Sequence, residues 1–139
     1  RYKEEREVLT IIHDFLGQAD EGWHLKMVEN LMLDGKKKEA ARLGHKMREY
    51  FPDKYQTYLA EGLLLKSEKD YQAAIDSFNR ASNIEPEAFR PFLEKSRAWL
   101  ASGEKENAIA VLNVAEKKME TLKDLKQIRT VKQFLETAR

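Results

Sequence analysis

Few side chains in this sequence of 139 residues are of a type and at a spacing that could do chemistry. The three histidines are His13, His24 and His45, and none has a second histidine three or four residues away, as a metal site on one helix face would require. The sequence also has no cysteine, no glycine-rich phosphate loop and no Gly-x-Ser-x-Gly turn. We therefore expect no catalytic residues, no metal site and no cofactor, and we predict that the chain is not an enzyme.

The charged residues are close to balance. Lysine and arginine number 25 and aspartate and glutamate 24, so the formal net charge of +1 gives no general attraction to a polyanion or an anionic membrane. Basic residues do gather towards the C-terminus, at Lys117, Lys118, Lys123, Lys126, Arg129, Lys132 and Arg139. A regulatory nucleic-acid binder is thus an alternative hypothesis. A solvated helix face is the interpretation we favour, because only one aromatic residue, Phe134, lies there for base stacking.

Nothing in the sequence predicts a membrane segment. No apolar stretch approaches the roughly 18 residues that span a bilayer, and the first residues lack the apolar centre of a signal peptide. We expect a soluble chain that does not insert into a membrane. Because it does not begin with methionine, it is compatible with a processed form or a segment of a longer protein, and its compartment stays open.

The elements that must position these side chains are helices. Apolar residues make up 42% of the chain, enough for one core, and charged residues make up 35%. With only three prolines and six glycines, the chain shows no alternating, turn-bounded run typical of strands. The composition and the length predict a single all-α domain.

Small and large apolar residues recur 34 positions apart without a gap. The matched pairs are Gly62 and Ser96, Ala74 and Ala108, Phe78 and Leu112, and Ala81 and Ala115. A shift of 34 in the other direction preserves fewer matches, so the first copy is degenerate. Turn residues interrupt each copy at matching places, which predicts two antiparallel helices per copy.

The middle copy has an aromatic-x3-Gly opening, a central Ala-x3-Phe and a closing proline, and with these features the sequence resembles the tetratricopeptide repeat family. The residues that carry the resemblance are Tyr58, Gly62, Ala74, Phe78, Ala81 and Pro86. Three copies are expected, at residues 21–54, 55–88 and 89–122. The third has Glu120 at the place of the proline. The resemblance implies a right-handed superhelix of antiparallel helix pairs.

Both ends are expected to form further helices. Within residues 1–20, Val8, Ile11, Ile12 and Phe15 have helical spacing and predict an N-terminal helix that packs against the repeats. Residues 123–139 follow a segment that resembles a capping box, and they continue an apolar stripe. The stripe consists of Leu122, Leu125, Ile128, Val131 and Leu135, and it predicts a closing helix that shields the last repeat from water.

In this family the first helices of successive copies line a concave groove, and partners commonly lie there. The resemblance implies an apolar track with a mixed polar rim. The predicted groove residues are Leu25, Lys26, Glu29, Leu59, Leu63, Lys66, Arg90, Leu93 and Arg97. An exposed track of this kind suits a peptide or an amphipathic helix of another protein. The alternative is that the leucines only pack between neighbouring first helices.

Some members of the family clamp the C-terminal carboxylate of heat-shock chaperones. Here Lys26 and Asn30 are one place out of register, Ala60 replaces the second asparagine, and the third copy pairs Arg90 with Glu94. We therefore expect no carboxylate clamp. The leading hypothesis is a protein–protein interaction module or assembly scaffold, and a self-associating scaffold is a further alternative, since the terminal face of such an array can stack on a copy of itself.

Overall fold

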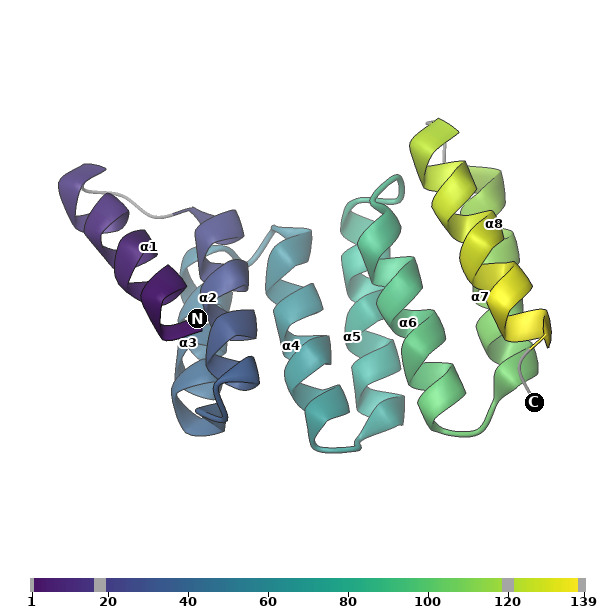
Figure 1. Cartoon of the computed structure of the whole chain (residues 1–139), viewed down its shortest axis with the longest axis horizontal. Coiled ribbons are helices and arrows are strands. Elements are labelled where there is room, and N and C mark those ends of the chain that lie inside the picture. Colours follow the sequence, from purple (N-terminus) through teal and green to yellow (C-terminus); the bar gives the residue numbers. More distant parts are fainter. Residues whose placement is uncertain (1, 17–19, 119–121, 138–139) are drawn as a thin grey trace.

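The computed structural model describes residues 2–16, 20–118 and 122–137, and within these ranges the side chains of all residues except 12–16, 122–124, 134 and 137. All secondary structure in this part of the chain is helical, as predicted. The helices are α1 (Tyr2–Leu16), α2 (Glu21–Leu33), α3 (Lys37–Tyr50), α4 (Tyr55–Ser67), α5 (Tyr71–Ile84), α6 (Phe89–Ala101), α7 (Lys105–Lys118) and α8 (Leu122–Thr137). Figure 1 shows α2, α4, α6 and α8 in one layer, with α3, α5 and α7 behind it.

The turn inside each helix pair has the same geometry every 34 residues. Gly35, Lys69 and Gly103 adopt the left-handed conformation, with φ of 77°, 64° and 89°. In each turn the amide of the next residue donates to a carbonyl five residues earlier, at 2.8, 3.0 and 2.9 Å. This is the Schellman arrangement, which satisfies the free carbonyls at a helix end. Lys69 occupies a position that glycine fills in the other two copies.

The interface inside each helix pair follows the predicted register. Ala40, Ala74 and Ala108 share one position of the repeat, and each is fully buried. A Cβ added to Gly62 would lie 2.3 Å from the nearest atom of the Phe78 ring, so only glycine lets α4 and α5 come this close. These contacts explain why small residues recur at these positions.

Two apolar cores run through the array. The larger lies between α2 and α5 and extends to Ala98 of α6. The smaller joins α6, α7 and α8, where Ile128 and Leu135 of α8 are buried with Phe92 and Leu112. The closing helix therefore packs onto α7. Leu122 was also predicted to belong to the apolar stripe of this helix, but its side chain lies outside the described residues.

The predicted apolar stripe of the N-terminal helix is wrong at two positions. Val8 and Ile11 of α1 are 55% and 67% exposed. The physical reason is that α1 packs mainly along α2, which covers only part of its surface. Among the described side chains a polar contact joins the two helices, since Trp23 Nε1 donates to the Leu9 carbonyl at 3.1 Å. The stripe's other two members, Ile12 and Phe15, have side chains outside the described residues.

Candidate functional site

The leucines predicted to line the groove lie mostly in the core. Leu25, Leu59 and Leu63 are 8%, 1% and 9% exposed, packed between α2, α4 and the helices behind them. Leu93 of α6 is half-buried. The helices α2 and α4 pack against each other, and Ala60 of α4 is small and fully buried in the same core, so the leucines are covered. For Leu25, Leu59 and Leu63 the structure therefore corresponds to the alternative, packing between neighbouring first helices.

Four of the five charged residues predicted for the groove, all except Lys26, form an ion-pair network around a buried carboxylate. Glu94 of α6 is 2% exposed. Its oxygens lie 3.3 Å from Lys66 Nζ, 3.2 Å from Arg97 Nη1 and 3.6 Å from Arg90 Nη2. A carboxylate in such a place must be paired, since an isolated buried charge is very costly. The network thus fixes α4 to α6.

Arg90 also connects the first and third repeats. Its Nη1 donates to Glu29 Oε2 of α2 at 3.1 Å, although the two residues are 61 positions apart in the sequence. In the layer of first helices, α4 lies between α2 and α6 (Figure 1). The hydrogen bond that Arg90 donates to Glu29 raises the pKa of Arg90 above its ordinary value, against the opposing effect of burial. Lys26 stands apart from this network and pairs with Glu5 of α1 at 2.7 Å.

An open apolar pocket remains at the C-terminal end of the same layer. It has a volume of about 430 Å³ and lies between α6 and α8. Leu100 there is 38% exposed, and the Arg97 side chain is 56% exposed. The residues that line the pocket are Leu93, Ser96, Arg97, Leu100, Thr130, Val131 and Leu135. Of the predicted groove residues, Leu93 and Arg97 therefore contribute to an open surface.

The contribution of α8 to this pocket was missed in the sequence, where residues 123–139 suggest only a closing helix. The sequence did contain a signal for this contribution, because Leu63, Arg97 and Val131 are spaced 34 residues apart and so share one position of the repeat. Residue 131 thus occupies the position of a groove residue in a further first helix. The sequence pattern could have extended the groove by one helix.

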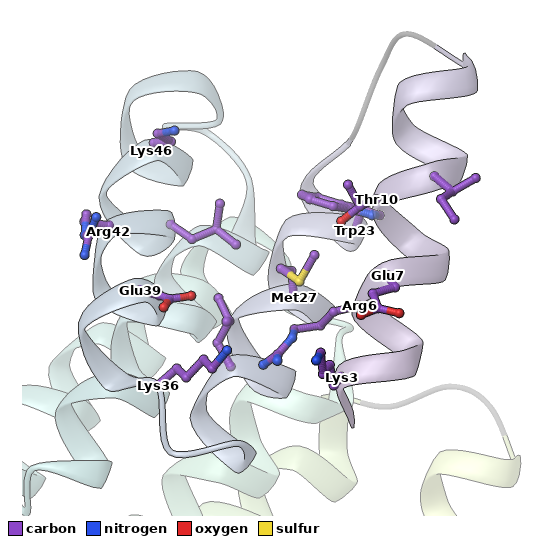
Figure 2. A pocket seen from close by; sticks show the side chains of 13 residues that line it. Lys3, Arg6, Glu7, Thr10, Trp23, Met27, Lys36, Glu39, Arg42 and Lys46 are labelled. Atoms are coloured by element: carbon purple, nitrogen blue, oxygen red, sulfur yellow. The ribbon is translucent and has the colours of Figure 1, made fainter. Parts of the chain in front are cut away.

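A larger groove of about 830 Å³ lies at the other end of the molecule, between α1 and α3 (Figure 2). Its floor is α2, through Trp23, Met27 and Leu31. The sequence did not predict it, because the stripe that includes Ile11 suggested a packed helix. With Ile11 exposed on the groove wall, the surface is instead open.

Of the three histidines, only His24 has described contacts with neighbouring groups. His24 Nδ1 lies 2.7 Å from the Asp20 carbonyl oxygen, and its ring contacts Trp23 and Phe51. His45 is exposed on α3, and the side chain of His13 lies outside the described residues. Among the side chains described, no three of histidine, aspartate and glutamate come together as a metal site would require. Nor is any helix in that part of the chain long and apolar enough to cross a membrane.

Comparison with known proteins shows the fold. No family model and no curated protein matches the sequence. Among solved structures, the chain is similar to TTC0263, a tetratricopeptide repeat protein of Thermus thermophilus, with a TM-score of 0.77 and 16% identity over 97% of this chain and 73% of that chain. It is also similar to the TPR2B domain of yeast Sti1 in its pHsp70 complex, with a TM-score of 0.67 and 18% identity over 81% and 92% of the two chains.

A further similar structure is the Yersinia enterocolitica type III secretion chaperone SycD in complex with a peptide of the translocator YopD. Its TM-score is 0.67, with 17% identity over 81% of this chain and 86% of that chain. At such identities the likeness concerns the fold. This chain therefore has the tetratricopeptide repeat fold, an all-α right-handed superhelix of antiparallel helix pairs, and the prediction from the 34-residue motif is confirmed.

Proposed function

We propose that this chain is a protein–protein interaction module that binds a segment of another polypeptide on the layer of its first helices. Two similar structures, those of the Sti1 domain and of SycD, are complexes with pHsp70 and with a YopD peptide. A shared fold alone does not assign a function, so the proposal depends on the surface of this chain.

The observation that carries the proposal is the open apolar pocket between α6 and α8. Its volume of about 430 Å³ accepts one or two apolar side chains, and exposed Leu100 offers apolar surface at its wall. Arg97, with more than half of its side chain in solvent, stands beside it and suits an acidic neighbour of the apolar anchor. The expected ligand is a peptide or amphipathic helix with an apolar anchor next to a carboxylate.

The ion-pair network gives this surface a fixed shape before a partner arrives. Glu94 holds α4 and α6 together, and Arg90 ties α6 to α2. A site that is already ordered loses less conformational entropy on binding. The same pairing leaves Arg90 engaged with carboxylates of the chain itself, Glu29 and Glu94.

The alternatives have weaker support. Two of the basic residues near the C-terminus are paired, because Lys132 Nζ lies 2.6 Å and Arg129 Nε 3.5 Å from the Glu116 carboxylate of α7. This pairing reduces the positive charge available to a nucleic acid. Hydrogen bonding from Lys132 lowers the pKa of Glu116 below its ordinary value. Self-association has no comparable observation in its favour.

The proposal is tested with a displayed library of random peptides selected on the wild-type chain. The best peptide is then titrated against Leu100→Asp and against Leu33→Asp, a matched change at an exposed leucine outside the pocket. We expect at least tenfold weaker binding to Leu100→Asp, equivalent to about 1.4 kcal/mol, and unchanged binding to Leu33→Asp. If the peptide bound both variants with equal affinity, its binding site would not be the α6–α8 pocket.

A further inference from the structure

The groove between α1 and α3 has an apolar floor. Trp23, Met27 and Leu31 are spaced four residues apart on α2, so they form one stripe along the helix. At 1.5 Å per residue the stripe is roughly 12 Å long. Trp23 is half-buried, and the exposed Ile11 of α1 adds apolar surface at the wall. Met27 and Leu31 are each only 8% exposed, so the apolar surface open to a partner comes mainly from Trp23 and Ile11.

The walls of the groove are predominantly basic. Its lining includes Lys3 and Arg6 on α1, and Lys36, Arg42 and Lys46 at the start and along the length of α3. The only carboxylates among the lining residues are those of Glu7 and Glu39. From Lys36 to Lys46 the positive charges extend along roughly 15 Å of helix. They are therefore too widely spread to converge on one small anion.

Arg6 is the most informative side chain of the groove. It is 8% exposed, and its Nη2 pairs with Asp34 Oδ2 at 2.5 Å. Its Nη1 is buried and has no hydrogen-bond partner. Figure 2 shows the side chain extending from α1 across the floor towards Lys36. A buried guanidinium N–H without an acceptor is costly, and a carboxylate that enters the groove would satisfy it.

We propose that this groove binds an acidic amphipathic helix of another protein. A helix suits the site because α1 and α3 stand on either side of α2, which forms the floor, so the guest would have three helical neighbours (Figure 2). Apolar residues on one face of the guest pack on Trp23 and Ile11. Aspartate and glutamate on its flanks meet Arg6 on one side and Arg42 and Lys46 on the other.

This site is separate from the pocket of the proposed function. Its wall α3 belongs to the layer behind the first helices, and α1 and α3 lie at the opposite end of the array from α6 and α8 (Figure 1). One chain could therefore hold two different partners. Variants in one site leave the other site intact, so the two proposals can fail independently.

The test uses two displayed libraries of helices about 15 residues long, the length of α1. Both carry randomised apolar residues on one face, and their flanks carry aspartate and glutamate in one library and lysine and arginine in the other. We expect the wild-type chain to select binders from the acidic library. These should bind Arg42→Glu/Lys46→Glu at least tenfold more weakly and lose affinity as salt is added.

The matched control is Lys37→Glu/Lys38→Glu, the same charge change at exposed residues of α3 that do not line the groove. It should leave binding unchanged. Equal losses in both double variants, or selection of the basic library, would overturn the proposal. So would competition by millimolar inorganic phosphate that displaces the helix completely, which would indicate a simple anion site. The proposal would also be overturned if the chain alone formed dimers and Arg42→Glu/Lys46→Glu abolished them, because the occupant of the groove would then be a second copy of the chain.

Discussion

Replacing Lys69 by glycine should stabilise the protein. Lys69 has a φ of 64° in the turn between α4 and α5, where the other two copies have glycine. A residue with a Cβ in the left-handed conformation costs about 1–2 kcal/mol. Glycine removes that cost but loses about 0.5–1 kcal/mol more backbone entropy on folding. The balance is a gain of about 0.5–1 kcal/mol, with no lost contact expected because the Lys69 side chain is exposed.

The two equivalent glycines provide the reverse experiment. A Cβ added to Gly35 or to Gly103 would meet nothing within 4 Å, so Gly35→Ala and Gly103→Ala change the backbone preference alone. Each should destabilise the fold by about 0.5–1 kcal/mol, which is the balance of the same two terms with its sign reversed. The opposite signs at equivalent positions follow from the recurrence of one turn geometry.

The assay is urea unfolding followed by circular dichroism at 222 nm. The midpoint should rise for Lys69→Gly and fall for the two alanine variants, at a constant slope m. In a thermal scan, the gain corresponds to a rise in Tm of about 1–4 °C for a chain of this size. A fall in stability for Lys69→Gly, or no loss for Gly103→Ala, would refute the assignment of these positions to one left-handed turn.

Three further predictions concern the core and the ion pairs. Gly62→Leu should cost at least about 1–3 kcal/mol, because a side chain there overlaps the Phe78 ring; an unchanged urea midpoint would contradict the register. Glu94→Gln should cost about 1–3 kcal/mol in the same assay, since the charge-assisted bonds of a buried carboxylate are lost, and an unaltered midpoint would show that the network is not stabilising. Hydrogen bonding from Arg6 lowers the pKa of Asp34 in the folded chain, so this pairing contributes above the ordinary carboxyl pKa of 3.8 and is lost as the pH falls through the lower folded value. Asp34→Asn should remove that part of the acid dependence of unfolding, and an identical pH profile would show the contribution to be negligible.

The repeat and its helix-pair interfaces could be predicted from the sequence because they depend on local spacing. Ala74 and Ala108 share a register that any 34-residue comparison reveals, and both are fully buried. The ion pair between Arg90 and Glu29 could not be predicted in this way, because it depends on how three repeats curve in space. Placing Leu59 on an open track failed for the same reason, since the approach of α4 to its neighbours decides its burial.

The groove at the N-terminal end was unpredictable for a different reason. The helical spacing of Val8 and Ile11 describes a face of α1, but it does not say whether another helix of the same chain covers that face. In this structure none of the described helices does so, and both side chains remain exposed. Helical spacing alone therefore does not predict burial.

The tie between Arg90 and Glu29 alters how the array should come apart. In a simple repeat array each unit contacts only its neighbours, so the terminal units fray independently and intermediates accumulate. Here an ion pair reaches past the middle unit, from α6 to α2. Opening either outer unit breaks a bond to the other, so the energetic penalty of fraying at one end is shared with the far end. The unfolding of the first and third repeats is therefore coupled, and fewer partly unfolded intermediates should accumulate than in an array with contacts between neighbours alone.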